Sequence, residues 1–397
     1  MSEAKCTFFD NPISGLEPLV TEAPRTDVFI VGGGPAGLAA AILAAGKGLR
    51  VTVADPSLPP IDKACGEGLM PDAVAALETL GIHLTSEEAI PFRGIRFGSG
   101  DGATSVEAAF SGRCGFGVRR RLLHARLVQR AADLGVSMLW GSRVTGYNGG
   151  EVFCQGRKIA CRWLVGADGE NSQVRRWMTD RRPRYERIRF GYRQHFQAAP
   201  WSDFVEVYWV RHGQIVAAPV GPREVCIALT SRSGHLRTDE ALKEAPRLAV
   251  RLAGAPVVTM GRGARAALRR LPAVHRENIA LVGDASGSVD PITGEGLGLA
   301  FQQAAALAEA LVVGDLRRYQ SAHDRIARFP RLMSRLILAM DSHPKFQSRA
   351  LRALAAEPQI FAKLLNTHVR ALSPSAFGIG NIFKLGWHLL ANGESEA

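Results

Sequence analysis

The chain has 397 residues, of which 46% are hydrophobic and 22% charged, so it can form more than one packed domain of ordinary globular composition. Its 49 basic and 37 acidic residues give a net charge of +12, which favours anionic ligands, lipid surfaces or acidic carrier proteins. The sequence contains no nucleic-acid-binding module, no clustered Cys/His set for a metal, no signal peptide and no run of about 18 apolar residues. We therefore expect a cytoplasmic protein with no metal site and no membrane-spanning helix, and the sequence leaves its oligomeric state open.

The first regular pattern lies in residues 26–55 and follows an irregular arm, residues 1–25. An apolar run at 28–31 is followed by glycines and then by an alanine-rich stretch, Pro35 to Lys47, with strong helix propensity. A second apolar run ends at Asp55. This succession predicts a strand, a helix and a second strand, and such a crossover implies a parallel sheet.

Further elements follow a Pro/Gly-rich loop at residues 56–70. Helices are predicted at 72–80, 120–134 and 296–313, and buried strands at 163–167 and 278–282. Aromatic and β-branched residues alternate over 186–232, which predicts an antiparallel sheet. The last part of the chain is predicted to be mostly helical, with breaks at Pro330, Pro344 and Pro374.

These elements predict an α/β chain whose domains are interleaved along the sequence. A nucleotide-binding domain with a Rossmann-like parallel sheet is expected to combine residues 26–90, 115–180 and 265–315. An antiparallel β-sheet domain for the substrate is expected to combine residues 91–114 and 181–264. A helical C-terminal region covers residues 316–397.

The most specific motif is the turn Gly32-x-Gly34-x-x-Gly37, which follows the first strand and opens the first helix. Gly32 permits the tight turn, Gly34 lets the backbone approach a pyrophosphate, and Gly37 lets helix and strand pack closely. The positive end of the helix then faces the phosphates. Asp55 comes 18 residues after Gly37, where its carboxylate would accept hydrogen bonds from a ribose. This motif alone does not distinguish NAD from FAD.

Two later segments carry a resemblance to a known superfamily. Residues 164–175 contain Asp168-Gly169-x-x-Ser172-x-x-Arg175, and residues 281–304 contain Gly283-Asp284, Pro291 and Gly294-Glu295-Gly296. Together with the glycine turn, and in this order, they resemble the flavoproteins that include aromatic hydroxylases (group A flavin monooxygenases), geranylgeranyl reductases and flavin-dependent halogenases. The resemblance covers residues 26–315 and implies a glutathione reductase-type FAD-binding domain.

The resemblance also implies which residues hold FAD. Asp284 would bind the ribityl chain, and Gly294–Gly296 would open a helix whose dipole stabilises the negative charge of the reduced flavin. Arg120 matches the start of a family helix, with Arg119 or Arg121 as alternatives. The full expected set is Gly32, Gly34, Pro35, Ala36, Gly37, Asp55, Cys65, Gly66, Arg120, Asp168, Gly283, Asp284, Pro291, Gly294, Glu295, Gly296 and Leu297.

The loop at residues 63–82 is similar to the geranylgeranyl reductase branch. It carries Cys65-Gly66 before Gly68-Leu69-Met70-Pro71, and the resemblance places this cysteine near the flavin and substrate. We take Cys65, Pro291 and Gly296 as the candidate catalytic residues. An ordinary small buried cysteine is the alternative for Cys65, since a reactive thiol needs a lowered pKa that no sequence shows.

Candidate substrate residues lie in the predicted sheet. Tyr208, Trp209 and His212 would line a cavity, and Pro219 resembles the strand end that faces the flavin. Arg193 and His195 lie on a neighbouring strand; for these positions, core packing and exposed turns are the alternatives. Apolar helices at Leu332–Met340 and Phe377–Leu390 would cap a cavity or lie on a membrane, with core packing again the alternative.

The predicted activity is flavin redox chemistry on a hydrophobic substrate: an isoprenoid, a polyketide or a carrier-bound acyl group. NAD(P)H or a protein donor would reduce FAD, which would then reduce a double bond or, with oxygen, hydroxylate the substrate. A halogenase is an alternative, although the Trp-x-Trp-x-Ile-Pro segment of tryptophan halogenases is missing. A non-catalytic FAD-binding protein is another alternative, and the intact Pro291 and Gly294–Gly296 argue against it.

Overall fold

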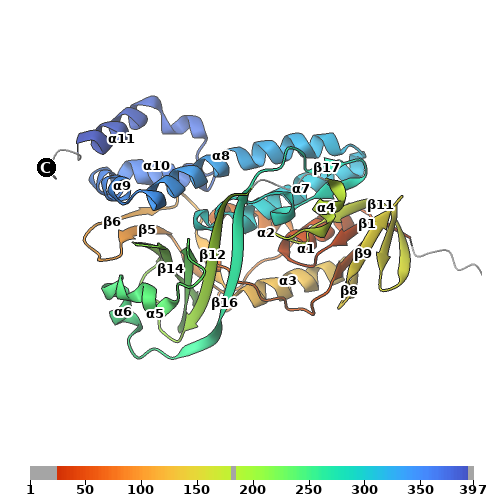
Figure 1. Cartoon of the computed structure of the whole chain (residues 1–397), viewed down its shortest axis with the longest axis horizontal. Helices are drawn as coiled ribbons and strands as arrows, with labels where there is room; N and C mark the ends of the chain where they lie inside the picture. The colour runs from red at the N-terminus through yellow and green to blue at the C-terminus, as the bar shows by residue number, and fades with distance from the viewer. Residues whose placement is uncertain (1–24, 180–184, 392–397) are drawn as a thin grey trace, which may run out of the picture.

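The computed structural model describes residues 25–179 and 185–391, and it contains two large sheets and a layer of C-terminal helices (Figure 1). The mixed α/β fold with a Rossmann-like parallel sheet is confirmed. Apart from Arg25, which begins the first strand, the arm expected at residues 1–25 lies outside the described residues.

The first sheet has a parallel core in the order β18-β11-β1-β2-β8. Its strands are β1 (Arg25–Val31), β2 (Val51–Asp55), β8 (Ser137–Trp140), β11 (Arg157–Gly166) and β18 (Ile279–Leu281). Antiparallel strands extend it: β9 (Val144–Asn148), β10 (Glu151–Cys154) and β17 (His275–Arg276). The predicted strand–helix–strand start is confirmed, because α1 (Pro35–Gly46) connects the parallel pair β1 and β2.

The second sheet is mostly antiparallel, in the order β16-β12-β15-β14-β13-β5-β6. Its strands are β5 (Gly94–Ser99), β6 (Ser105–Ala109), β12 (Tyr185–Phe196), β13 (Phe204–Val210), β14 (Gly213–Gly221), β15 (Glu224–Ser231) and β16 (Val257–Arg269). This confirms the antiparallel sheet predicted at 186–232. Residues 265–269, which the predicted division gave to the nucleotide-binding domain, pair with β12 in this sheet.

The remaining elements connect and cover the two sheets. A small sheet joins β3 (Gly68–Leu69), β7 (Gly115–Val118) and β4 (Ala89–Phe92). The earlier helices are α2 (Pro71–Thr79), α3 (Arg120–Asp133), α4 (Gln173–Met178), α5 (Thr238–Lys243), α6 (Pro246–Leu252), η1 (Gly283–Ser286) and η2 (Pro291–Thr293). The later helices are α7 (Gly296–Val313), α8 (Leu316–Ser342), α9 (Pro344–Ala356), α10 (Pro358–His368), η3 (Pro374–Phe377) and α11 (Ile379–Ala391).

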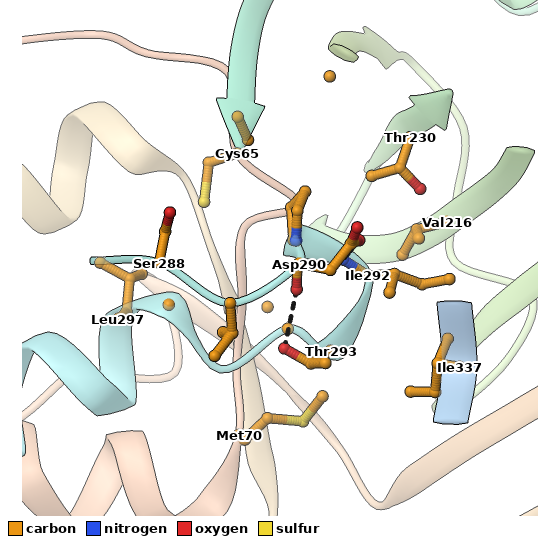
Figure 2. Close-up of a pocket in the computed structure, with 18 of the residues that line it drawn as sticks. Cys65, Met70, Val216, Thr230, Ser288, Asp290, Ile292, Thr293, Leu297 and Ile337 are labelled. Atoms are coloured by element: carbon orange, nitrogen blue, oxygen red, sulfur yellow. Dashed lines mark hydrogen bonds between the residues drawn. The ribbon is translucent and has the colours of Figure 1, made fainter. Parts of the chain in front are cut away.

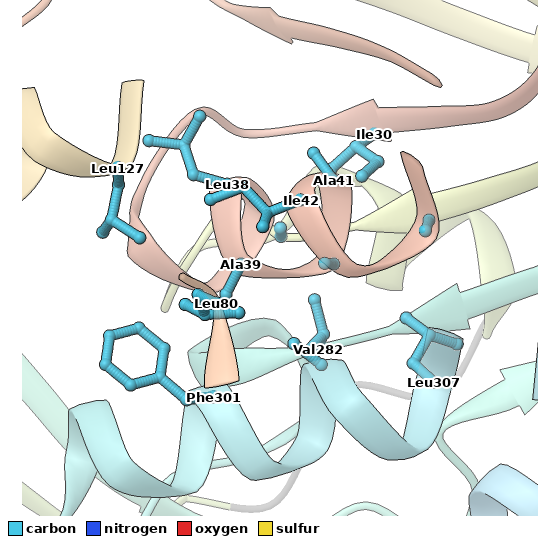
Figure 3. Close-up of a cluster of buried hydrophobic side chains, with 14 of the residues drawn as sticks. Ile30, Leu38, Ala39, Ala41, Ile42, Leu80, Leu127, Val282, Phe301 and Leu307 are labelled. Carbon is cyan, nitrogen blue, oxygen red and sulfur yellow. The ribbon is translucent and has the colours of Figure 1, made fainter. Parts of the chain in front are cut away.

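The largest hydrophobic cluster lies where α1 packs against α7 (Figure 3). Leu38 and Ala39 from α1 meet Phe301 and Leu307 from α7, and none of these side chains is more than 1% exposed. By length and composition, α7 is the one helix among the described residues that could cross a membrane, yet 56% of its apolar window is buried inside the protein. Its apolar residues are thus accounted for by core packing.

The predicted helix break at Pro330 is wrong, because α8 continues through it. Proline has no N–H, so it cannot donate to the carbonyl oxygen of Ile326 one turn earlier. That oxygen instead accepts a hydrogen bond of 3.0 Å from the guanidinium of Arg370, just beyond α10. The substitute donor satisfies the carbonyl and ties α8 to the chain after α10. Pro344 and Pro374 do begin new helices, as their positions predict.

We expect Leu307→Ala to lower the free energy of unfolding by about 2–5 kcal/mol, because it opens a cavity in the α1–α7 core. Val313→Ala on the same helix is the control, since Val313 is 54% exposed and should change this energy by less than about 0.5 kcal/mol. Urea unfolding with the cofactor content held equal measures both. Equal, small effects would contradict the assignment of this cluster as the main core.

Candidate functional site

A cavity of about 1740 Å³ opens where the carboxyl edge of the first sheet meets the second sheet and the C-terminal helices. Ligands bind at this edge in open α/β folds. Figure 2 shows the central part, where Cys65, Ser288 and Leu297 lie on one side and Val216 and Thr230 of the second sheet on the other. The volume exceeds the roughly 300–1,000 Å³ of ordinary small-molecule sites, so there is room for more than one ligand.

The glycine turn forms one end of this cavity. Gly32 has φ +110°, and a Cβ there would lie 2.4 Å from the carbonyl oxygen of Ala167. A Cβ on Gly37 would lie 1.9 Å from the oxygen of Gly32, so this residue serves helix packing and does not line the cavity. Gly34, by contrast, lines the cavity and has nothing within 4 Å of the position of a Cβ. Pro35 and Ala36 line the cavity beside it.

Asp55 supports this turn directly. Its Oδ2 accepts a hydrogen bond of 2.8 Å from the backbone N–H of Gly33, and its Oδ1 accepts one of 2.8 Å from Ser57. His124, which the sequence did not single out, supports the same turn: Nδ1 accepts from the N–H of Ile61, so Nε2 donates to the oxygen of Gly33 at 2.8 Å. Burial lowers the pKa of His124, in keeping with a neutral ring.

The two later acidic residues differ in their surroundings. Asp168 lines the cavity, but its carboxylate also accepts hydrogen bonds from Ser172 Oγ and from the backbone N–H groups of Gln173 and Val174, so it caps α4. Asp284 is half-exposed, and its Oδ2 lies 3.4 Å from the Nζ of Lys63. Its carboxylate therefore has acceptor capacity left for a ligand.

The segment before α7 forms the middle of the cavity wall. Pro291, Gly294, Gly296 and Leu297 line the cavity, as does Gly283. Glu295 does not: it is 5% exposed, and its Oε1 lies 3.7 Å from His368 Nδ1 behind the wall. Burial raises the pKa of Glu295 well above its usual value, which favours a neutral carboxyl group beside the helix end.

None of the four predicted substrate residues lines the cavity. Tyr208 points to the far face of its strand and donates to Glu206 at 2.6 Å, and His212 sits on an exposed turn. Trp209 is 3% exposed and packs against Ile337 and neighbouring side chains. Pro219 is buried against Gly117. The residues of β13, β14 and β15 that line the cavity are instead small or aliphatic, apart from Thr230: Val205, Val207, Val216, Ala228, Leu229 and Thr230.

Cys65 and Gly66 line the cavity, and the next residue carries an interaction that the sequence did not indicate. Glu67 is 2% exposed, and its carboxylate contacts Arg193 at 2.7 Å and His195 at 2.6 Å. Arg193 also lines the cavity, whereas His195 lies behind it. The positive φ of Glu67, 58°, is unusual for a residue with a side chain and is the kind of local strain found at functional sites.

Residues 25–314 match the family model described as the FAD binding domain. The chain belongs to the FAD-binding flavoprotein family. It is an FAD-dependent oxidoreductase, and the predicted superfamily is confirmed. The matched residues, 25–314, include all the glycine and aspartate motifs and much of the cavity wall.

Relatives and solved structures agree with this assignment. The flavoprotein is 32% identical over 327 residues to the menaquinone reductase of Mycolicibacterium smegmatis, covering 75% of this chain and 79% of the relative. It is 24% identical to digeranylgeranylglycerophospholipid reductase 1 of Methanothermobacter thermautotrophicus, covering 92% and 99%. A solved flavoprotein/dehydrogenase from Cytophaga hutchinsonii shares the fold, with a TM-score of 0.76 at 16% identity, covering 93% and 98%.

The cavity residues of this flavoprotein fit FAD. Gly34, Gly66 and Gly296 all line the cavity, and a Cβ on any of them would meet nothing within 4 Å, so their backbones leave open space for a cofactor. Gly34 and Gly296 stand at the N-terminal ends of α1 and α7, where free N–H groups and the helix dipole favour negative charge. The Nε of Arg120 is buried at this wall without a hydrogen-bond partner among the described residues.

We expect Gly34→Val to weaken FAD binding by about 1–3 kcal/mol or more, roughly tenfold to a hundredfold, because the side chain would occupy open cavity beside the phosphates. The protein without FAD should keep its stability, since the space is empty and the φ of −73° is ordinary. Titration of the apoprotein with FAD and its thermal unfolding measure the two effects.

Gly46→Ala is the matched control, because Gly46 ends the same helix and also has nothing near an added Cβ. This variant should bind FAD as the wild type does. Wild-type FAD affinity in Gly34→Val would contradict the placement of the cofactor at this turn.

Proposed function

We propose that this flavoprotein reduces a carbon–carbon double bond in an isoprenoid chain. The observation that carries the proposal is the apolar extension of the cavity beyond the cofactor wall, between the second sheet and the C-terminal helices. Its lining is almost free of polar groups and comes mainly from α8, α9 and α10: Leu332, Met333, Leu336, Ile337, Met340, Phe346, Ala350, Leu354, Phe361, Leu364 and Leu365.

A long apolar pocket suits a long apolar ligand, since each Å² of apolar surface removed from water contributes about 25 cal/mol. The names of the relatives support the same class of substrate, because menaquinone and geranylgeranyl groups both carry isoprenoid chains. Small side chains on the cavity face of the sheet, such as Val205 and Val207, leave the cavity wide enough for such a chain. An aromatic polyketide would not need the full depth of this extension.

When bound and reduced, FAD supplies the hydride for such a reaction. The chain's own residues bind and orient the reactants. The turn at Gly34 would receive the phosphates, Asp55 and Asp284 would accept hydrogen bonds from sugar and ribityl hydroxyls, and the positive end of α7 would face the pyrimidine edge. We propose NAD(P)H as the electron donor and the cytoplasm as the location.

The loop that holds Cys65 would close the reacting end of the cavity. The thiol is half-buried, and its Sγ accepts a hydrogen bond of 3.4 Å from the N–H of Glu67. Ser288 and Leu297 lie on the same side of the cavity (Figure 2). We propose that Cys65, with Pro291 and Gly296, borders the reacting atoms and limits the access of water to them.

The reaction is tested with holoenzyme reduced anaerobically by NADPH or dithionite and mixed with geranylgeranyl diphosphate, which has no quinone ring that reduced flavin could reduce. We expect the flavin to reoxidise without oxygen and the product to gain two hydrogen atoms by mass spectrometry. A fully saturated analogue is the control and should not reoxidise the flavin. Oxygen-dependent turnover with gain of one oxygen atom would instead make the protein a hydroxylase and contradict the proposal.

We also propose that the mouth of the extension contacts an anionic lipid surface. Arg325, Arg328, Leu332 and Leu336 all line the cavity, are exposed to solvent, and follow one another at spacings of three or four residues along one face of α8. The two leucines are 51% and 48% exposed. Exposed apolar side chains beside arginines favour insertion at a negatively charged membrane interface.

Binding to vesicles of phosphatidylglycerol, measured by co-sedimentation, should exceed binding to phosphatidylcholine and should fall as salt rises. The double variant L332S/L336S should bind less, whereas Val250→Ser should not, because Val250 is equally apolar and 75% exposed but lies on α6, away from the mouth. Equal loss in both variants, or no binding by the wild type, would contradict the lipid contact and favour a carrier protein.

A further inference from the structure

A buried hydrogen-bonded chain of three side chains connects the cavity wall to the outside of the second sheet. It consists of Glu67, His195 and Thr259, which come from the loop before β3, from β12 and from β16. The Nε2 of His195 lies 2.6 Å from Oε2 of Glu67, and its Nδ1 lies 2.6 Å from Oγ1 of Thr259. None of the proposed cofactor or substrate contacts requires this arrangement.

The identity of the acceptors fixes the direction of each hydrogen bond. An ionised carboxylate only accepts, so Nε2 of a neutral His195 carries the hydrogen and donates it to Glu67. Nδ1 then accepts the O–H of Thr259. A proton that reaches the threonine from outside can therefore be passed along the chain, because the threonine and the histidine can each accept at one atom and donate at another, and the carboxylate accepts at the end.

The two ends of the chain lie in different surroundings. Glu67 lines the cavity next to Cys65 and Gly66, the loop proposed to border the reacting atoms. Thr259 is partly exposed on β16, the edge strand of its sheet, and its neighbours Val257 and Val258 are about half-exposed. His195 between them is fully buried. The chain thus spans the protein wall from solvent to cavity.

Neighbouring charges keep the buried carboxylate stable. Arg193 is 2% exposed and contacts Glu67 at 2.7 Å and Asp62 at 3.0 Å, and Arg262 lies 3.6 Å from Asp62. The backbone N–H of Arg120 donates to Glu67 Oε1 at 2.9 Å. Burial works against the ionised form, yet the hydrogen bonds from His195 and the N–H of Arg120, with the charge of Arg193, hold the pKa of Glu67 below its usual value.

Cys226 also faces this cluster, and its thiol does not compete for the proton. It is fully buried, and burial together with the charge of Glu67 raises the pKa of its thiol well above the usual value. It therefore stays neutral, and its Sγ donates a weak hydrogen bond to the oxygen of Cys65 at 3.9 Å.

Reduction of a double bond adds a hydride to one carbon and a proton to the other, so a largely apolar cavity needs a source of protons at its wall. We propose that Glu67, His195 and Thr259 form a relay that delivers this proton from solvent to the cavity wall. The relay rests on the proposed function for its use in catalysis, although its geometry is independent of the substrate.

In one delivery, the Nε2–H bond of His195 breaks and an O–H bond forms on Glu67, while Nδ1 takes the proton of Thr259 and the threonine takes one from water, which leaves hydroxide in the solvent. The O–H bond of Glu67 then breaks as its proton passes into the cavity. No electrons are transferred in these steps, and the hydride is supplied by reduced FAD. The three residues of the relay transfer protons, and none of them needs to contact the hydride donor.

The test follows a proton into the cavity without any substrate, since two-electron reduction of a flavin takes up a proton. FAD in the holoenzyme is reduced by a light flash in weakly buffered solution containing a pH-indicator dye, and proton uptake is timed. We expect His195→Gln to slow uptake by about 10²-fold, the lower end of what a positioned acid–base group contributes. Thr259→Val should slow it in the same direction, and Thr259→Ser, which restores the hydroxyl, should recover the wild-type rate.

Thr145→Val on β9 is the matched control, because its hydroxyl also donates to a single partner, the oxygen of Phe153, far along the sequence from the relay. Wild-type proton uptake in both His195→Gln and Thr259→Val would overturn the relay, and so would equal slowing in Thr259→Val and Thr259→Ser. Failure of the proposed function has a different signature: normal relay behaviour in this assay but no reduction of any isoprenoid substrate.

Discussion

The close contact between Gly37 and Gly32 is the constraint on which the cofactor side of the molecule depends. Neither position has room for a Cβ, so α1 lies directly against β1 and the adjacent strand β11. The N-terminal end of α1 is thereby held at the carboxyl edge of the sheet, next to Asp55 and Asp168. The same helix then packs against α7, whose own N-terminal end lies at the middle of the cavity. The packing of α1 against the sheet and against α7 thus places the N-terminal ends of both helices, which carry partial positive charge, at one cavity.

Two buried arginines on β12 connect the sheet domain to the rest of the protein. Arg193 contacts Asp62 and Glu67 from the loop after β2, whereas Arg189 contacts Asp341 of α8 at 2.5 Å and lies 3.5 Å from Asp290. Removing one partner of a buried ion pair typically costs about 3–5 kcal/mol. One strand therefore fixes both the cysteine-bearing loop and the wall before α7, so the reacting region is held from both sides.

The sequence predicted the cofactor side of the cavity better than the substrate side, for a physical reason. Gly34, Asp55 and Gly296 follow from backbone requirements that recur in fixed order along the chain: a strand, a tight turn and a helix end. The substrate wall depends on which face of each strand turns inward. Tyr208 and Trp209 looked like ligand contacts because they are large and aromatic. Tyr208 lies on the strand face opposite Val207, whereas Trp209 shares the face of Val207 but is covered by α8 and α9. Glu67 could not be found because its partners lie more than 100 residues away, on β12.

The proline inside α8 has a consequence for the stability of the helix that borders the cavity. Pro330 lies next to Phe329 and close to Leu332, which line the cavity, and the carbonyl that it leaves without a helical donor is satisfied by Arg370. The exposed side chain of Arg370 therefore stabilises α8 at the point where the helix lacks one backbone hydrogen bond. Arg370 therefore stabilises the helix that borders the cavity from outside the cavity, because it contacts the backbone of α8 but does not line the cavity.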